Sequence, residues 1–316
     1  MSFEIIGFGK GAPALSVSND KLSELVDTND EWISSRTGIR SRHFSQGETL
    51  TDLSTAAARQ ALAWAGVTAD QLDYIICSTV QGDYITPSLS CMVQRELGAT
   101  CTAFDINAAC TGFIYNLDVA AALMDSGKAE HILVVSAEMM SKHLDWDDRT
   151  TCVLFGDGAG AVVLRKGNGL RSIVTSAMGA EGPLNAPATH KSPYFDNGVT
   201  KPKLSMQGSE VFKFAVSHMT RESKTAMAKA NVTSADIKKF LPHQANMRII
   251  RSSTKNLGFA DEQVATNIDR YGNTSSATIP ILLCELMEAE ALTKGDTILM
   301  AAMGGGLTSG AAVVTL

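Results

Sequence analysis

The sequence predicts an α/β fold in which two duplicated β-α-β halves pack together in layers. Each half contains a helix end followed by a Val-Thr turn and a buried strand, then a second buried strand, then a glycine-rich turn with a third strand. The repeated segments occur in the same order: residues 61–77 and 226–242, 131–137 and 297–302, and 156–164 and 304–314. Three matches in one order indicate an internal duplication. We therefore expect an N-terminal half, residues 1–165, and a C-terminal half, residues 166–316.

Helix-like runs alternate with short apolar strands along both halves. The expected helices are residues 53–65, 88–97, 112–126, 210–230, 247–257 and 278–291. This alternation favours mostly parallel sheets buried on both faces, and a site is expected where the halves meet. Residues 179–206 break the pattern with four of the eight prolines. We interpret that segment as the connection between the halves together with covering loops.

Composition and charge indicate which classes of protein this chain can belong to. The 316 residues are 45% hydrophobic and carry a formal net charge of -6, which is typical of a folded chain and disfavours nucleic acid as the main partner. No apolar run is long enough to span a membrane, and the first residues lack the pattern of a secretory signal. The six cysteines are scattered without a C-x-x-C pair, so we expect a cytoplasmic protein without a disulfide framework or a metal site.

Cys110 is the strongest candidate for chemistry. It lies between a strand-like run and the helix expected from residue 112, beside the small residues Ala108, Ala109 and Gly112. Unpaired N–H groups at a helix N-terminus favour the thiolate, so the position predicts a nucleophile. The alternative is a small buried core residue, which describes most free cysteines.

Two further candidates stand at the ends of expected elements in the second half. His243 follows an apolar strand, and Asn273 lies in a turn that leads into a helix. Functional side chains concentrate at such ends. A histidine after a strand is more often structural, however, and an asparagine beside a glycine is more often a turn former.

Three motifs carry a resemblance to a known family. They are Asp105-Ile-Asn-Ala-Ala-Cys110-Thr-Gly-Phe113, Pro242-His243-Gln-Ala-Asn-Met-Arg248 and Tyr271-Gly-Asn273-Thr-Ser-Ser-Ala277. They are similar to the active-site motifs of the β-ketoacyl-acyl-carrier-protein synthase III family, condensing enzymes with a thiolase-like fold that start fatty-acid synthesis. Residues 28–40 and 155–160 resemble further signatures of the family. The family's Cys-His-Asn set maps onto Cys110, His243 and Asn273, whereas elongating relatives use two histidines.

The resemblance implies a mechanism in two halves. Cys110 takes the acyl group of an acyl-CoA primer, acetyl-CoA or somewhat longer, and malonyl-acyl-carrier protein then enters. His243 and Asn273 stabilise the enolate formed by decarboxylation, and the N–H groups of Cys110 and Gly306 form the oxyanion hole. Acyl-CoA is a substrate here, and no cofactor or metal is implied. An enzyme of the same fold that primes polyketide synthesis is the alternative. A non-catalytic acyl-binding subunit and a cysteine hydrolase are weaker ones.

Binding residues are also implied by the resemblance. The CoA-binding positions correspond to Trp32, Arg36, Arg149 and Asn246. Basic residues spaced to share one helix face suit an acidic carrier protein, and the full expected carrier-binding set is Gln244, Ala245, Asn246, Met247, Arg248, Lys213, Arg251 and Lys255. Thr86 occupies a position that in the family lines the acyl pocket from the partner subunit of a homodimer. The alternative for the charged residues is an ordinary solvated surface.

Overall fold

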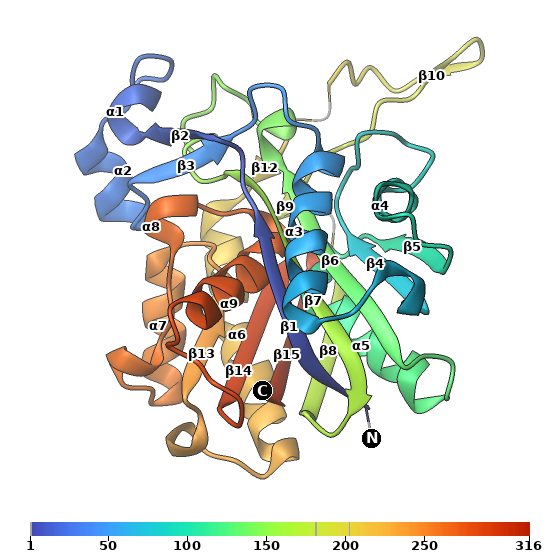
Figure 1. The fold of residues 1–316 in the computed structure, drawn as a ribbon. Coiled ribbons are helices and arrows are strands. Elements are labelled where there is room, and N and C mark those ends of the chain that lie inside the picture. Colours follow the sequence, from blue (N-terminus) through green and yellow to red (C-terminus); the bar gives the residue numbers. More distant parts are fainter. Residues whose placement is uncertain (1, 181, 202) are drawn as a thin grey trace.

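The protein is described from a computed structural model that covers residues 2–180, 182–201 and 203–316 (Figure 1). Two central sheets dominate it. In spatial order, the first contains β1 (Ser2–Gly11), β7 (Asp157–Gly167), β6 (His131–Met139), β4 (Tyr74–Ser78) and β5 (Thr102–Ile106). The second contains β13 (Lys239–Pro242), β14 (Thr297–Gly304), β15 (Gly306–Thr315) and β8 (Leu170–Ala180).

Nine α-helices and several short strands complete the described part. The helices are α1 (Asn19–Leu22), α2 (Asp30–Thr37), α3 (Leu50–Ala65), α4 (Leu89–Leu97), α5 (Gly112–Asp125), α6 (Gly208–Ala230), α7 (Met247–Leu257), α8 (Ile268–Tyr271) and α9 (Thr278–Glu288). The short strands are β2 (Leu15–Ser18), β3 (Ser41–Phe44), β9 (Leu184–Asn185), β10 (Lys191–Ser192), β11 (Phe195–Asp196) and β12 (Ser205–Met206). None of these helices has the length and apolarity that crossing a membrane requires.

The duplication read from the sequence is visible in the topology. The order β1-β7-β6-β4 in the first sheet repeats as β8-β15-β14-β13 in the second. Corresponding neighbours also run in the same relative directions: antiparallel, antiparallel, then parallel. The division into halves at residue 165 falls within β7 and stays a prediction.

The helices form layers around the sheets. One core cluster joins α5 and α9 to residues of both sheets, so these two helices fill the space between them. A second cluster packs α3 and α4 against the outer side of the first sheet, and a third packs α6 and α7 against the second (Figure 1). The α/β architecture in layers is as predicted.

The expectation of mostly parallel sheets is wrong. Four of the seven strand pairings in the two large sheets are antiparallel, and three are parallel. β14 turns directly into β15 through Gly305 alone. A parallel neighbour requires a crossover of a dozen or more residues, which such a short turn cannot provide.

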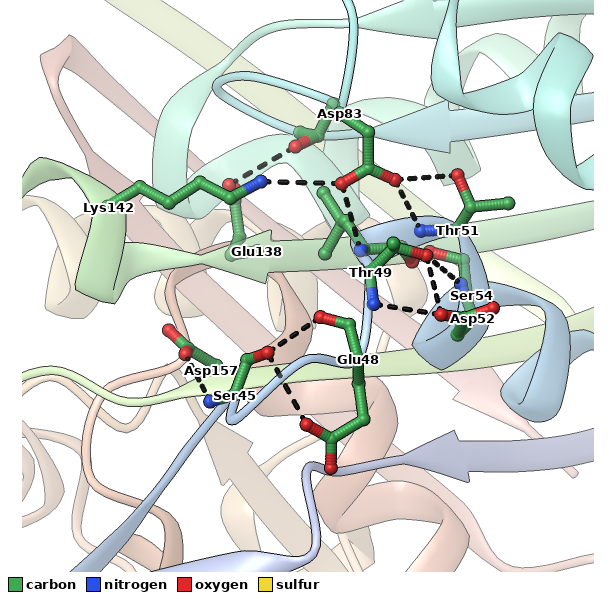
Figure 2. Close-up of polar contacts among 12 residues, drawn as sticks. Ser45, Glu48, Thr49, Thr51, Asp52, Ser54, Asp83, Glu138, Lys142 and Asp157 are labelled. Carbon is green, nitrogen blue, oxygen red and sulfur yellow. Dashed lines mark hydrogen bonds and ion pairs between the residues drawn. The ribbon is translucent and has the colours of Figure 1, made fainter.

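Helix α3 begins earlier than its apolar pattern predicts, because its first turn is capped. The Thr49 side chain accepts a hydrogen bond from the Asp52 N–H, and the Asp52 carboxylate accepts one from the Thr49 N–H, a reciprocal capping box. Asp83 accepts hydrogen bonds from the N–H groups of Leu50 and Thr51 at 3.0 and 2.8 Å. Figure 2 shows Asp83 between this first turn and Lys142, which ties the loop that carries Asp83 to the helix.

The glycine-rich run 156–160 has a packing role. The sequence suggests a tight turn here, but Gly158 and Gly160 lie inside β7. A Cβ atom on Gly160 would stand 2.7 Å from the Ile281 nitrogen and 2.8 Å from the Pro280 side chain. The glycine therefore lets α9 approach the sheet closely, which positions the loop before α9.

The proline-rich segment contains only short paired strands. β9 pairs with β12, and β10 pairs with β11 in a hairpin that projects from the molecule at the upper right of Figure 1. Leu184 and Met206, at the base of this segment, line the main cavity. The segment thus covers the site from one side, as the sequence suggests. Two residues of the predicted connection, Glu181 and Pro202, lie outside the described residues.

Candidate active site

The fold brings Cys110, His243 and Asn273 to one cavity of about 240 Å³. Cys110 lies in a 3-10 turn, Ala109–Thr111, between β5 and α5. His243 directly follows β13, and Asn273 lies in the loop between α8 and α9. All three are buried. The nucleophile candidate comes from the first repeat and its two partners from the second.

His243 is neutral in this environment. It is 1% exposed, and burial lowers its pKa to about 3. Its Nδ1 lies 2.7 Å from the Thr278 hydroxyl, which in turn lies 3.1 Å from the Ser275 carbonyl. If the hydroxyl donates to Nδ1, then Nε2 carries the proton. If it donates to the carbonyl, Nδ1 carries the proton instead. Thr278 therefore controls which ring nitrogen is a donor.

Asn273 is held so that its amide nitrogen is free for a ligand. Its Oδ1 accepts a 2.8 Å hydrogen bond from the Ser275 N–H. Its backbone pairs with the segment before β7, through hydrogen bonds to Leu154 and from Gly156. Because Asn273 lines the cavity and its oxygen is occupied, Nδ2 is the group it can offer to a carbonyl oxygen.

Cys110 is a protonated thiol in this structure. Burial raises its pKa to about 12, against which a hydrogen bond from the Ser275 hydroxyl at 3.4 Å acts in the opposite direction. Burial therefore opposes the thiolate, which a helix N-terminus is expected to favour. The role of Cys110 as the nucleophile stays a prediction. The nucleophile needs a proton acceptor to react.

The glycine turn meets the nucleophile at Gly304, two residues before the predicted Gly306. Gly304 lines the cavity, and a Cβ atom there would stand 2.7 Å from the Cys110 nitrogen. Gly306 is exposed, starts β15 with φ +87° and is absent from the cavity wall. Residue 304 is thus the glycine that adjoins the Cys110 amide, and the assignment of Gly306 to the oxyanion hole stays a prediction.

The mouth of the cavity carries an aromatic and basic group. Trp32, Arg36 and Asn246 line it, and the Arg36 guanidinium lies 4.7 Å from the centre of the Trp32 ring. Arg149 lies outside the wall but is 5.5 Å from the same ring, and it is bound to the carbonyl and carboxylate of Asp27. Asn246 caps α7 through its Oδ1, which accepts from the Arg248 N–H, so its Nδ2 is left for a ligand.

The predicted carrier-protein surface is largely exposed, with one exception. Arg251 and Lys255 on α7, Arg248 at the cavity mouth and Lys213 on the adjoining α6 are all exposed. Ala245, Asn246 and Met247 are half-buried. Gln244 is fully buried, and its side chain forms hydrogen bonds with backbone groups of Pro242, Ala265 and Asn267. Its assignment as a carrier-protein contact is wrong, because it supports the strand end before α7.

Thr86 lies away from the cavity of its own chain. It is exposed, in the loop between β4 and α4. Tyr84 and Ile85, in the same loop, are 56% and 96% exposed. A role for Thr86 in an acyl pocket therefore requires a second copy of the chain.

Three residues near the site were not singled out from the sequence. Thr278 adjoins His243, and Ser275 adjoins both Cys110 and Glu138. Glu138 lies on β6, where it is the sole acidic residue of a buried strand. The sequence could have pointed to Glu138, because an acidic residue within an apolar strand is unusual. Ser275 and Thr278 gave no such indication, because they resemble ordinary turn and cap residues. The described residues contain no group of three or more side chains that could hold a metal ion.

Comparisons with known proteins identify the family of this chain. A family model described as 3-oxoacyl-acyl-carrier-protein synthase III matches residues 104–182. A second model, described as the C-terminal part of the same enzyme, matches residues 227–316. A β-ketoacyl-acyl-carrier-protein synthase III of Clostridium perfringens is 46% identical over 327 aligned positions, covering 99% of both chains.

Solved structures show the same fold over the whole chain. The crystal structure of 3-oxoacyl-acyl-carrier-protein synthase III from Aquifex aeolicus superposes with a TM-score of 0.94 at 43% identity, covering 99% of this chain and 100% of the other. A priming β-ketosynthase from a polyketide biosynthetic pathway superposes with a TM-score of 0.95 at 36% identity, covering 100% and 96%. The chain therefore belongs to the 3-oxoacyl-acyl-carrier-protein synthase III family, whose members are condensing acyltransferases with a thiolase-like fold.

Proposed function

We propose that the chain starts fatty-acid synthesis by condensing an acyl-CoA primer with malonyl-acyl-carrier protein, with Cys110, His243 and Asn273 as its catalytic residues. The observation that carries this assignment is their meeting in one cavity with an aromatic and basic mouth. The product is a β-ketoacyl-acyl-carrier protein, and carbon dioxide and free CoA are released.

In the first half-reaction Cys110 becomes acylated. Its sulfur attacks the thioester carbonyl of the primer, the bond to the CoA sulfur breaks, and CoA leaves as the thiol. The oxyanion formed on the way accepts hydrogen bonds from the Cys110 N–H and from the glycine turn at residues 304–306, which adjoins that amide.

In the second half-reaction His243 and Asn273 act as hydrogen-bond donors. The malonyl thioester oxygen accepts from Asn273 Nδ2 and from His243 Nε2, which requires the Thr278 hydroxyl to donate to Nδ1. Loss of carbon dioxide leaves an enolate that these donors stabilise. The enolate carbon attacks the acyl group, and the Cys110 sulfur leaves. A neutral imidazole suits this role because no proton is abstracted by it.

The cavity mouth is suited to CoA. Trp32 offers an aromatic ring on which an adenine can stack, and Arg36 and Arg149, both close to that ring, supply charge for phosphates. Asn246 Nδ2 can donate to the amide groups of the pantetheine arm. The steps use CoA thioesters as substrates and assign no role to a cofactor or metal.

The carrier protein is assigned to the basic face of α6 and α7. Arg248 lines the cavity, and Lys213, Arg251 and Lys255 are exposed on the same two helices. None of the four forms an ion pair with the described acidic residues. An acidic carrier protein docked there would direct its pantetheine arm to Cys110. The attraction is between exposed charges, so it should weaken as salt is raised.

A homodimer would explain the exposed loop and the free sheet edge. β5 is the edge strand of the first sheet, with Phe104 and Ile106 only half-buried. Pairing of two β5 edges would cover them and bring Tyr84, Ile85 and Thr86 against the partner. In that arrangement Thr86 can line the partner's acyl pocket, where its small side chain leaves room for a primer longer than acetyl. Since all six cysteines are free, a cytoplasmic location is proposed.

Priming of polyketide synthesis is the second candidate. The superposition on a priming polyketide β-ketosynthase at 36% identity supports it, although the enzymes from Aquifex aeolicus and Clostridium perfringens are more similar, at 43% and 46% identity. The two differ in the acceptor carrier protein rather than in the catalytic residues.

Separate assays of the two half-reactions test the roles. Cys110→Ala should abolish both acylation by acyl-CoA and condensation. His243→Ala should reduce condensation by roughly 10²-fold while acylation stays within about threefold of the native rate. Equal loss of both half-reactions in His243→Ala would contradict the assignment of His243 to the second step.

A further inference from the structure

Glu138 is a buried carboxylate close to the nucleophile. It is 2% exposed, and its Oε1 accepts hydrogen bonds from the hydroxyls of Ser275 and Ser276 at 3.1 and 3.0 Å. Its Oε2 accepts from the Val80 N–H at 3.0 Å and lies 3.4 Å from the Thr79 hydroxyl. No lysine or arginine of the described residues forms an ion pair with it. Hydrogen bonds alone therefore compensate its burial.

Ser275 links this carboxylate to the reacting sulfur. Its Oγ lies 3.4 Å from Cys110 Sγ and 3.1 Å from Glu138 Oε1. A single hydroxyl proton cannot serve both neighbours at once, so the oxygen can accept from one while donating to the other. Ser275 also has φ +51°, a conformation that non-glycine residues rarely adopt and that marks functional sites.

We propose that the Ser275 hydroxyl and the Glu138 carboxylate relay the thiol proton of Cys110 during acylation. As the sulfur attacks the primer, its proton moves to Ser275 Oγ and the Ser275 proton moves to Glu138 Oε1. When the bond to CoA breaks, the relay runs in reverse and the proton passes to the departing CoA sulfur. Two protons move in each direction, and the net result is the transfer of one proton from the Cys110 sulfur to the CoA sulfur, with Ser275 and Glu138 restored to their starting states. This relay rests on the proposed acyl transfer to Cys110.

The acid strengths of the neighbouring groups make Glu138, rather than His243, the proton acceptor. The free thiol holds its proton more tightly than the Glu138 carboxylate does, so the proton leaves only as the new carbon–sulfur bond forms and makes the sulfur more acidic. Burial raises the pKa of Cys110 to about 12, so the thiol is protonated at pH 7. Burial raises the pKa of Glu138 to about 7, which makes it a far stronger base near neutrality than His243, whose pKa burial lowers to about 3. Cys110 is the titratable group that faces Glu138; its other contacts from β4 and the 275–276 turn are hydroxyl and N–H groups.

Ser276 provides a matched control. It is as buried as Ser275 and donates to the same carboxylate oxygen, but the bond to Cys110 Sγ is made by Ser275. Ser275→Ala should break the relay and keep the backbone N–H that holds Asn273. Ser276→Ala keeps the path from Cys110 Sγ through Ser275 to Glu138 and removes one hydrogen bond that lowers the pKa of Glu138. Glu138→Gln keeps the shape of the side chain and removes the proton acceptor.

The rate of Cys110 acylation by acetyl-CoA, followed as the burst of CoA release, should fall roughly 10²-fold in Ser275→Ala and in Glu138→Gln. Ser276→Ala should stay within about threefold of the native rate. The melting temperature of each variant identifies any that fold poorly. Equal acylation rates in Ser275→Ala and Ser276→Ala would overturn the relay.

The pH profile separates a relay from a merely structural role. A carboxylate accepts a proton only when ionised, so the native rate should rise with pH through about 7 and then level off. In Glu138→Gln the inflection should vanish, and the rate should follow thiolate formation at alkaline pH. An unchanged inflection in Glu138→Gln would overturn the relay.

Alkylation of Cys110 by iodoacetamide tests the relay without acyl-CoA. Ser275→Ala and Glu138→Gln should be alkylated more slowly than the native protein at pH 7.5, and Ser276→Ala at the native rate. If no acyl-CoA acylates even the native protein, the proposed function fails, while the alkylation series still decides whether the relay exists.

Discussion

Burial sets the chemical state of each residue in the cavity. It keeps His243 neutral and Cys110 protonated, and it raises the pKa of Glu138 to about 7. The carbonyl-binding donors and the proton acceptor are thus different groups. His243 and Asn273 serve the second half-reaction, and the Ser275–Glu138 pair is assigned to the first.

Thr278 should matter only for the second half-reaction. Without its hydroxyl, nothing fixes the proton on Nε2 of His243. Thr278→Val should slow carbon dioxide release from malonyl-acyl-carrier protein by roughly 10²-fold, with acylation little changed. Thr278→Ser should restore the rate. A Thr278→Val enzyme that decarboxylates at the native rate would contradict this control of the tautomer.

Gly304 should be intolerant of any side chain, unlike its neighbour. A Cβ atom at residue 304 would collide with the Cys110 amide at 2.7 Å, whereas one at residue 305 meets its nearest atom at 3.5 Å. Gly304→Ala should displace the nucleophile and lower acylation by roughly 10²-fold or more. Gly305→Ala is the matched control. An acylation rate in Gly304→Ala equal to that of the native protein would show that the turn does not position Cys110.

The catalytic residues were predictable because a motif carries each of them. Cys110, His243 and Asn273 stand in three recognisable segments, and the structure brings them together. Ser275, Thr278 and Glu138 act through contacts between segments far apart in the chain, which no local pattern encodes. Three successive glycines look alike in sequence, so the close approach of Gly304 to the Cys110 amide could not be read from it.

The elements around the site owe their positions to caps and close packing. Helix α3 starts at Leu50 because Asp83 and the capping box satisfy its first N–H groups, and the same contacts anchor the loop of residues 79–88 (Figure 2). Helix α9 approaches β7 through Gly160 and thereby positions Thr278 at its first turn.

Asp83→Asn should destabilise the protein and loosen that loop. Burial raises the pKa of Asp83, but hydrogen bonds from Thr51 and Leu50 outweigh it, so the folded pKa lies below the ordinary value. The stabilisation is present at neutral pH and is lost as pH falls below about 4. We expect a loss of about 1–2 kcal/mol at pH 7 in thermal unfolding.

Asp52→Asn serves as the control for this change, because Asp52 caps the same helix without touching the loop. Amide hydrogen exchange in residues 81–87 should be faster in Asp83→Asn than in Asp52→Asn. Equal exchange in the two variants would mean that Asp83 does not hold the loop.

Helix positions followed from periodicity, whereas strand directions did not. α7 has the predicted bounds, Met247–Leu257, because its apolar face and its cap are both local. α9 ends at Glu288, before the predicted end, since Glu290 takes a left-handed conformation with φ +53°. Whether two buried strands run parallel depends on the path between them, and an apolar run has the same pattern in either direction.

The molecule as a whole uses its duplication to build an asymmetric site. Two sheets with the same strand order meet across α5 and α9, and the cavity at their junction takes different residues from each side. The internal repeats were legible in the sequence, so the layered α/β fold was predictable from it. The cavity was not, because its walls come from eight separate segments of the chain.

The exposed loop predicts a dimer. Ile85 is 96% exposed in the single chain, and burial of such a side chain would be expected in an assembly. Ile85→Glu should convert a dimer to a monomer in light scattering coupled to size exclusion. Leu25→Glu is the control, because Leu25 is also highly exposed, at 75%, but lies outside this loop. A native protein that elutes as a monomer would contradict the dimer.

Intact-protein mass spectrometry after mixing with acetyl-CoA and longer or branched acyl-CoAs, with peptide mapping of the adduct, tests the assignment of Cys110 as the acyl acceptor. A single acyl group on Cys110, absent from Cys110→Ala and removed by malonyl-acyl-carrier protein, is the predicted result. The same series reveals which primer length is preferred. An unmodified Cys110 with every primer, or an adduct on another cysteine, would contradict it.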